Sequence, residues 1–331
     1  MTVGFVRVEV EDNSSPLGSP LRQREFRAEV DRRCRQEWHL GALRTLYARM
    51  LRVHKNRCTF DIEMETENGP HLVIGKVHDV ERSDIHSAMH EIIESSFCDD
   101  ASFTIARPLA YLPSLHVLLE EKVRGLIGKD VFLKGNADEQ LAVAERCGAW
   151  LARFHKLAPR LGNFVPPQEQ LTSHQKWNDA IAQSGEPLTA KCEQLLQRLK
   201  IMAPSATELA PRAGHGSYMP DHVFVDGSRT IVIDFDEHDA ADPARDVSTF
   251  IVALRRLGLK KLESIDVFDP AIDTFLRAYS ADAPKGAMEH LSFYKAALFL
   301  HKAQRDLFKW SPPFRDRAEI MIREGFRSLR Q

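Results

Sequence analysis

The stretch that decides the fold runs from His215 to Asp246 and reads HGSYMPDHVFV (215–225), DGSR (226–229) and TIVIDFDEHDAADPARD (230–246). Two short apolar runs flank an Asp-Gly pair, which favours a tight hairpin turn because Asp and Gly tolerate a positive φ. Polar residues stand directly before the first run and directly after the second. A hairpin would hold these two polar loops close together at one end, in an arrangement that suits a metal and its ligand.

The composition limits the class of protein. The chain has 331 residues, of which 43% are hydrophobic and 28% charged, and such values are typical of a globular protein with a sizeable core. A formal net charge of -2 and dispersed basic residues give no reason to expect a nucleic-acid partner. No apolar run approaches the ~20 residues of a membrane span, and the amino terminus lacks the features of a signal peptide, so no membrane partner is expected.

The cysteines indicate the compartment. Five cysteines, an odd number without a paired short spacing, predict free or buried thiols in a reducing environment. We therefore expect a cytoplasmic protein.

The first third of the chain changes its period. Residues 1–24 contain Gly, Ser and Pro and predict a flexible arm, although residues 3–10 have the pattern of an edge strand. From residue 24 to about 51, the helical spacing of Leu40, Leu43 and Leu46 predicts a helix. Alternation and apolar spacing then predict, in order, a strand (58–65), a strand (71–78), a helix (84–97) and two strands (103–112 and 115–123).

The rest of the chain is mostly helical in pattern. A helix is predicted over 137–157, with His155 near its end as a structural hydrogen bonder, and another from Thr189, a plausible cap, to Met202. Further helices are predicted over 247–257, 271–279, 288–310 and 314–329.

Residues 215–246 resemble the catalytic and metal-binding region of the aminoglycoside phosphotransferase family, a branch of the protein-kinase-like fold. The family pattern is His-Gly-Asp-x-His-x-x-Asn, a hairpin, Ile-Asp-(Phe/Trp)-(Asp/Glu) and Asp-Pro-x-x-Asp. The positions that match are His215, Gly216, Asp234, Phe235, Asp236, Asp242, Pro243 and Asp246. Three positions depart, with Ser217 in place of the catalytic Asp, Met219 in place of the second His and His222 in place of the metal-binding Asn.

The resemblance extends over roughly residues 50–330 and implies an α+β, two-lobed protein-kinase-like fold. A small β-rich amino-terminal lobe with one main helix would span residues 25–123. A larger, mostly helical carboxy-terminal lobe would span 124–331, and its insertion 158–210 would build much of the substrate pocket.

The resemblance also implies a nucleotide site. Lys76, in the strand Val73–Val77, corresponds to the lysine that holds the α- and β-phosphates of ATP, with Glu91 on the following helix as its partner. Glu94, one turn further on, is the rival partner. Judged without the later motif, Lys76 would be an ordinary surface lysine.

Two other parts of the implied nucleotide site depend on the main chain. Backbone groups near Glu121 and Val123 would contact the adenine. The segment Arg52–Phe60 contains no glycine where a phosphate-covering loop is expected. Either backbone amides cover the phosphates there without glycine, or the cover is lost.

For the metal, Asp234 is the expected main ligand of Mg²⁺, because a carboxylate at a strand end is a rigid oxygen donor. Asp236 would act through water or bind a cationic substrate. His222 would be the second ligand, and its imidazole suits Mn²⁺ or Zn²⁺ better than Mg²⁺. The site would then either hold one metal on Asp234 alone or have an altered metal preference. Asp221 is the alternative oxygen donor beside it.

For catalysis, the position of the expected general base is changed to Ser217. Ser217 is not a useful base near neutral pH, and loss of general-base help costs ~10²–10⁴-fold in rate. Asp221 or Asp236 would then accept the proton of the substrate. His215 and Asp246, by resemblance, anchor the catalytic loop.

Two functions follow as hypotheses. The first is ATP-dependent phosphotransfer to a hydroxyl of a small molecule of the aminoglycoside, sugar or choline-like class. The acidic run that includes Asp234, Asp236 and Asp239 favours a cationic or polyhydroxylated acceptor. The second is a catalytically impaired kinase-like module that binds a nucleotide or small molecule and acts through a protein partner.

Overall fold

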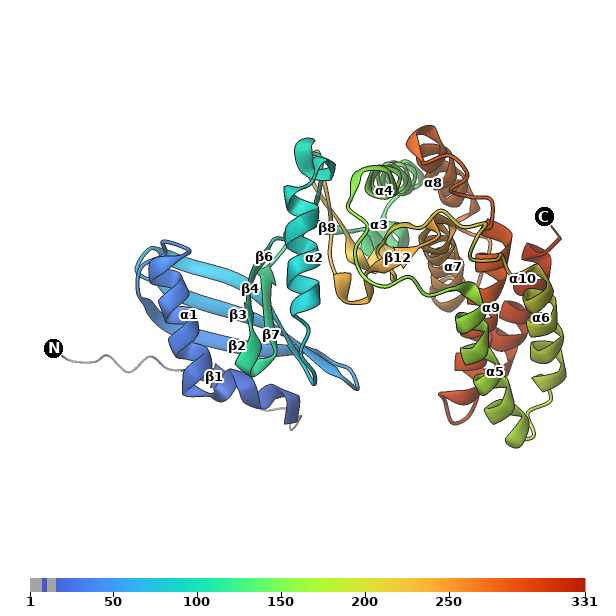
Figure 1. The fold of residues 1–331 in the computed structure, drawn as a ribbon, viewed down its shortest axis with the longest axis horizontal. Helices are drawn as coiled ribbons and strands as arrows, with labels where there is room; N and C mark the ends of the chain where they lie inside the picture. Colours follow the sequence, from blue (N-terminus) through green and yellow to red (C-terminus); the bar gives the residue numbers. More distant parts are fainter. Residues whose placement is uncertain (1–7, 11–15, 331) are drawn as a thin grey trace. The chain divides into compact units, whose positions relative to one another are not determined.

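The computed structural model describes residues 8–10 and 16–330, and the chain divides into two compact units (Figure 1). The amino-terminal unit comprises residues 1–94 and 105–124, and the carboxy-terminal unit comprises residues 95–104 and 125–331. Residues 95–104, expected in the amino-terminal lobe, therefore group with the helices. The reason is packing, because the Phe97 ring meets Trp150 edge-on at 5.2 Å and Trp150 Nε1 donates to Thr104 O at 2.9 Å.

The amino-terminal unit is built on a six-stranded sheet in the order β1-β2-β3-β4-β7-β6. Its elements are β1 (Val8–Val10), a 3-10 helix (Pro16–Arg22), α1 (Arg24–Gln36), β2 (Leu43–Val53), β3 (Arg57–Thr66), β4 (Gly69–His78), α2 (Ser83–Glu94), β6 (Pro108–Leu112) and β7 (Val117–Glu121). Helix α1 covers one face of this sheet (Figure 1), where Phe26 and Val30 join a buried cluster with Phe60 and Val77.

Two expectations for this unit need correction. The predicted helix over 24–51 ends at Gln36, and residues 43–53 form strand β2. The β2–β3 register shifts between Leu43 and Thr45 and again between Met50 and Arg52, so the buried residues lose the strict alternation of a strand and imitate a helical spacing.

The predicted flexible arm, residues 1–24, lies partly outside the described residues. Within the described part, β1 pairs in parallel with β2, and Leu21 of the 3-10 helix is fully buried in the core of the unit. This apolar anchor explains why residues 16–22 pack on the sheet.

The carboxy-terminal unit consists mainly of helices, with short strands that carry the motif residues. Its helices are α3 (Gly128–Lys134), α4 (Ala137–Leu157), α5 (Pro167–Gln183), α6 (Thr189–Met202), α7 (Pro243–Lys261), α8 (Asp269–Asp282), α9 (Leu291–Phe308) and α10 (Arg315–Ser328). Its strands are β5 (Phe103–Ile105), β8 (Leu126–Ile127), β9 (Arg212–Gly214), β10 (Val223–Asp226), β11 (Arg229–Val232) and β12 (Asp239–Ala241). The order of the four-stranded sheet is β5-β11-β10-β8, and β12 pairs with β9.

The predicted helices over 137–157 and 189–202 are confirmed with the same bounds. Helix α5 was not expected, because His174 and Asn178 lie among its buried residues and conceal the apolar face. Thr189 is not the cap of α6; its hydroxyl donates to Glu186 O at 2.6 Å within the first turn. Among the described residues, no helix is long and apolar enough to cross a membrane.

Candidate functional site

The predicted hairpin is confirmed. Strands β10 and β11 pair antiparallel from Val223↔Val232 to Asp226↔Arg229, and Gly227 in the turn has φ +55°. At the open end, Ile233 N–H donates to His222 O at 3.0 Å. The loop before the hairpin and the loop after it therefore meet at one end, as the pattern indicated.

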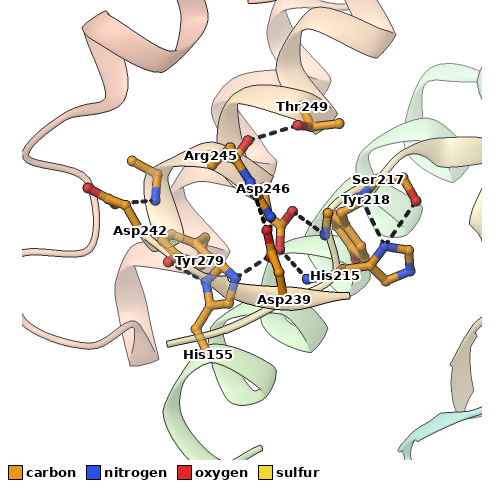
Figure 2. A network of polar contacts seen from close by, with 12 residues as sticks. His155, His215, Ser217, Tyr218, Asp239, Asp242, Arg245, Asp246, Thr249 and Tyr279 are labelled. Carbon is orange, nitrogen blue, oxygen red and sulfur yellow. Dashed lines mark hydrogen bonds and ion pairs between the residues drawn. The ribbon is translucent and has the colours of Figure 1, made fainter. Parts of the chain in front are cut away.

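The loop before the hairpin is anchored by Asp246, which lies in the first turn of α7 (Figure 2). Its Oδ2 accepts the N–H of His215 at 2.7 Å, and its Oδ1 accepts the N–H of Gly216 at 3.0 Å. His155 Nε2 lies 3.4 Å from Oδ2, and His155 Nδ1 lies 2.8 Å from Tyr279 Oη. His155 is thus the structural hydrogen bonder that the sequence predicted.

Electrostatics keep this buried anchor ionised. Burial by itself would raise the pKa of Asp246, but the hydrogen bond with His155 and the charge of Arg245 outweigh it and lower this pKa to about 2. Arg245 is itself held by Asp239 at 2.5 Å (Figure 2). The loop is therefore fixed by a carboxylate that stays charged at neutral pH.

Gly216 is required by a close approach of two backbone segments. Its φ is +79°, and a Cβ atom there would lie 1.9 Å from Glu237 O. No other residue type fits without moving one of the two loops.

Ser217 follows this glycine and is partly buried. His215 Nε2 lies 3.0 Å from Ile233 O, and since a carbonyl can only accept, Nε2 carries the proton and Nδ1 is the acceptor. Ser217 N and Oγ lie 3.3 and 3.4 Å from this Nδ1 (Figure 2). Burial, with the nearby His222, lowers the pKa of His215 to about 4, so its ring is neutral at physiological pH.

The metal-ligand candidates Asp234 and His222 are brought together. His222 Nε2 lies 3.4 Å from Asp234 Oδ2, and the His222 ring stacks on His215 with centroids 5.8 Å apart. Asp234 has the left-handed conformation, with φ +70°, which is strained for a residue with a Cβ and is typical of functional sites. Its carbonyl oxygen lies 3.5 Å from Ser217 Oγ, so the two loops meet at these residues.

The donor set fits a hard divalent cation that has few protein ligands and is held mainly by phosphate oxygens and water. Among the described residues, no group of three or more His, Cys, Asp or Glu side chains is arranged to hold a metal. Mg²⁺ characteristically takes one or two protein carboxylates and completes its shell with phosphate oxygens and water. One carboxylate, Asp234, with His222 beside it, agrees with that pattern.

The other predicted site carboxylates are mostly engaged by protein cations or buried. Asp221 Oδ1 lies 2.6 Å from Lys129 Nζ, and Asp236 is 7% exposed in the turn after Asp234. Asp239 pairs with Arg245, and Asp242 Oδ2 lies 2.7 Å from His290 Nδ1. The acidic run therefore offers less free negative charge to a cationic acceptor than its sequence suggests.

In the amino-terminal unit, Lys76 lies on the face of the sheet opposite the apolar core. Its Nζ lies 2.9 Å from Glu120 Oε1, and both side chains are at least 94% buried. Glu91, the predicted partner, is an exposed residue of α2, as is Glu94. Lys76 thus pairs with a strand glutamate in the structure, and a role for the helix residue Glu91 in the nucleotide site stays a prediction.

The register explains why Glu120 is the partner. Lys76 pairs with Leu118 and Ile74 with Glu120 across β4 and β7, so Lys76 and Glu120 are diagonal neighbours on one face. A charged residue inside the apolar strand VLLEE was the available signal.

The same region contains a second buried carboxylate that the sequence did not single out. Asp61 of β3 is 3% exposed and accepts from Lys122 Nζ at 2.7 and 2.8 Å and from Arg49 Nη2 at 3.1 Å. Lys122 stands between Glu121 and Val123, the predicted adenine-binding positions. Glu121 N–H is already donated to Arg107 O at 2.8 Å, whereas Val123 lies in the coil beyond β7.

The remaining expectations concern the phosphate cover and the cysteines. Residues 54–56 form a tight turn without glycine, in which His54 N–H donates to Arg57 O at 2.7 Å. All five cysteines are free, and four of them are buried, which confirms the prediction of unpaired thiols.

Comparison with known proteins identifies the relatives of this arrangement. The sequence matches the model of the phosphotransferase enzyme family (APH) over residues 81–290. No curated protein matches the sequence. Among solved structures, a proposed aminoglycoside phosphotransferase from Ralstonia eutropha JMP134 has a TM-score of 0.63 at 15% identity, covering 92% of this chain and 98% of that one.

Two further structures resemble this one. The protein APH(2'')-IIa, solved in a ternary complex with streptomycin and ATP, has a TM-score of 0.57 at 15% identity and covers 90% of this chain and 98% of its own. A choline/ethanolamine kinase family protein from Mesorhizobium loti has a TM-score of 0.53 at 14% identity and covers 93% and 94%. At these identities the likeness concerns the fold, and it confirms the α+β protein-kinase-like fold predicted from the sequence.

Proposed function

The chain belongs to the phosphotransferase enzyme family, and from this premise we propose that it transfers the γ-phosphoryl group of ATP to a hydroxyl of a small molecule. The observation that carries the proposal is the convergence of Ser217 and Asp234, whose Oγ and carbonyl oxygen are 3.5 Å apart on two separately anchored loops. Phosphoryl transfer needs positioned charge more than covalent chemistry. A rigid meeting point of this kind supports such positioning.

Nucleotide binding would use Lys76, Glu120 and Asp234. Lys76 would hold the α- and β-phosphates, with Glu120 aiming its ammonium group. Asp234 would be the main ligand of Mg²⁺, or of Mn²⁺ if the His222 imidazole joins it. The bound metal would neutralise charge on the phosphate oxygens.

The proton of the acceptor hydroxyl needs a base other than Ser217. Asp221 is the weaker candidate because Lys129 already neutralises it. Asp236 follows Asp234 by two residues in the same 3-10 turn, and we assign the base role to it. His215 is less suited, because its lowered pKa makes it a weak base.

The acceptor class in this proposal is a small polyhydroxylated or cationic molecule of the aminoglycoside, sugar or choline-like type. Related folds were solved with gentamicin, streptomycin and spectinomycin, which supports the class without selecting a member. A cytoplasmic location accompanies the proposal, since ATP and free thiols are both expected there.

One observation favours a second candidate, a nucleotide-binding module without transferase activity that acts through a protein partner. Ser217 stands where the family has its catalytic Asp, and its hydroxyl and amide both contact His215 Nδ1. The reactive position would then be occupied by a structural hydrogen bond.

Thermal unfolding with ATP, in the presence and absence of Mg²⁺ or Mn²⁺, tests the shared part of both candidates. A ligand at ~100 times its Kd adds roughly 2.7 kcal/mol to the free energy of unfolding, which raises the Tm by several degrees. We expect a metal-dependent shift that Lys76→Ala abolishes. No shift for the wild-type protein at saturating ATP would contradict both candidates.

Turnover with a panel of acceptors separates the two. If the protein is a phosphotransferase, Asp234→Asn abolishes turnover, and Ser217→Asp preserves or raises it by up to ~10²–10⁴-fold. Turnover that survives Asp234→Asn would refute the metal assignment. Nucleotide binding without turnover, even in Ser217→Asp, would favour the binding module.

A further inference from the structure

A group of exposed aromatic side chains lies between the end of α9 and the start of α10. Figure 1 shows the two helices. Phe308, Trp310 and Phe314 are 53%, 52% and 40% exposed, and we call them the aromatic tip. The rings of Trp310 and Phe314 are 5.5 Å apart, and Phe308 meets Trp177 of α5 at 5.6 Å. Contiguous apolar exposure of this kind marks an interaction surface more often than isolated exposed residues do.

The tip is fixed in place by bonds at both of its ends. Phe314 N–H donates to Asp306 O at 2.9 Å, which folds the connecting segment back onto α9. Arg315 Nε donates to both Glu186 oxygens, at 3.1 and 3.0 Å. The aromatic rings are therefore presented by an anchored turn, so a partner does not have to order it.

Basic residues surround the aromatic tip. Lys302, Arg305 and Lys309 follow one another at spacings of three and four residues along α9, which places them on one face. Lys309 Nζ lies 5.7 Å from the Trp177 ring centroid, and the Arg317 guanidinium lies 3.5 Å from that of Phe314.

The carboxylates of this region offset little of that charge. Asp306 is fully buried and accepts from Arg256 Nη1 and Nη2 at 2.7 and 2.5 Å, and Glu186 is engaged by Arg315. Asp316 and Asp179, which follows Trp177 by two residues, are exposed and offset part of the positive charge, and Glu319 of α10 is paired with Lys191. Burial, followed by the charges of the nearby Arg305 and Arg256, lowers the pKa of Lys302 to about 8.

We propose that the aromatic tip and its basic rim form a docking surface for an anionic lipid bilayer. Trp and Phe side chains partition into the headgroup region, and Lys and Arg near them bind acidic lipids, so the two kinds of residue act on the same membrane. The protein would lie on the membrane and not cross it. The inference does not depend on the phosphotransferase proposal, and it revises the expectation of no membrane partner, which considered only spanning segments.

The test is sedimentation of the full-length protein with vesicles of phosphatidylcholine alone or with 30% phosphatidylserine, a composition on the order of that of anionic cytoplasmic membranes. We expect binding to the anionic vesicles that weakens as salt rises. Replacing Phe308 and Trp310 by Ser should weaken partitioning at least about tenfold. Replacing Arg305 and Lys309 by Gln should weaken it about 25-fold, from roughly fivefold per charge.

Matched controls lie elsewhere in the same unit. Ile201 and Met202 at the end of α6 are 84% and 45% exposed, and their replacement by Ser should leave vesicle binding unchanged. The exposed residues Lys134 and Lys285, replaced by Gln, provide the charge control. Thermal unfolding of each variant verifies its fold.

Three results would overturn the proposal. One is the absence of wild-type binding to anionic vesicles, and another is equal losses in the control variants. The third is self-association that the Phe308/Trp310 variant abolishes while no lipid binding is seen, which would assign the tip to a contact between copies of this chain.

Discussion

The loop around His215 has two regions that are held very differently. Its anchored base, formed by the amides of His215 and Gly216 on Asp246, is buried and hydrogen-bonded to a carboxylate that remains charged. Its outer part, formed by Ser217 and His222, carries two of the positions that depart from the family pattern. Ser217 N and Oγ lie 3.3 and 3.4 Å from His215 Nδ1, and His222 Nε2 lies 3.4 Å from Asp234 Oδ2. The base matches the family at each of its positions.

This difference shows that the fold constrains the residues at the base of the loop and leaves the sequence of its outer part free to vary. Buried backbone N–H groups need acceptors, so replacing Asp246 has a large cost in stability. Ser217 satisfies no buried charge, so its replacement costs little stability whatever it does to activity. A change of function is therefore accommodated in the outer part of the loop without loss of the fold.

The largest expected effect is at the base. Asp246→Asn should lower the free energy of unfolding by roughly 3–5 kcal/mol, because it leaves Arg245 and two amides facing a neutral side chain. Urea unfolding measures it. Ser217→Ala should change the same quantity by less than about 1 kcal/mol.

A control at the surface separates the effect of burial from the effect of losing a charge on the free energy of unfolding. Asp282 pairs with Lys156, and both side chains are about half exposed (54% and 49%). Asp282→Asn should cost less than about 1 kcal/mol. A loss from Asp282→Asn as large as that from Asp246→Asn would contradict the argument.

The second effect extends the comparison to the amino-terminal unit. Glu120→Gln should lower the free energy of unfolding by about 3 kcal/mol and reduce the Tm shift produced by ATP, because it removes the buried anion beside Lys76. Glu91→Gln, at an exposed position, should leave the free energy of unfolding within about 0.5 kcal/mol of wild type and the Tm shift produced by ATP unchanged. Differential scanning fluorimetry with and without ATP measures both quantities, and the reverse order would restore the helix glutamate as the partner.

The third effect compares two glycines with positive φ. Gly216→Ala would place Cβ 1.9 Å from Glu237 O, whereas Gly227→Ala meets nothing within 4 Å. In both variants the left-handed conformation costs about 1 kcal/mol. Because Gly216→Ala also brings Cβ against Glu237 O, it should lower the free energy of unfolding by roughly 2 kcal/mol more than Gly227→Ala. Chemical denaturation of the two variants measures this difference, and equal costs would show that the two loops separate readily.

The smallest effect concerns pH. The pKa of Asp246 is lowered to about 2 from a usual value of 3.8, so the folded protein binds fewer protons than the unfolded chain between these values. This contribution to stability, roughly 2 kcal/mol, is complete above pH 4–5 and is lost as pH falls towards 2. The difference in stability between wild type and Asp246→Asn should therefore shrink over that range, and a constant difference would refute the assigned pKa.

The sequence alone determined the hairpin, the long helices and the identity of the loop residues, because these depend on local signals. The Asp-Gly turn, the helical period over 137–157 and the spacing from His215 to Asp246 are all readable in short windows. Short windows also predict a helix where β2 lies, because its register shifts remove the alternation by which a strand is recognised in sequence.

Only the tertiary structure decided which side chains meet. Glu120 pairs with Lys76 because of the register of β4 and β7, which no local pattern encodes. Asp61 likewise lies beside Lys122, 61 residues later in the chain, because β3, which carries Asp61, and β7, which ends one residue before Lys122, belong to one sheet. Pairing across distant segments depends on how the whole chain packs, and the charge that each site carries follows from that packing.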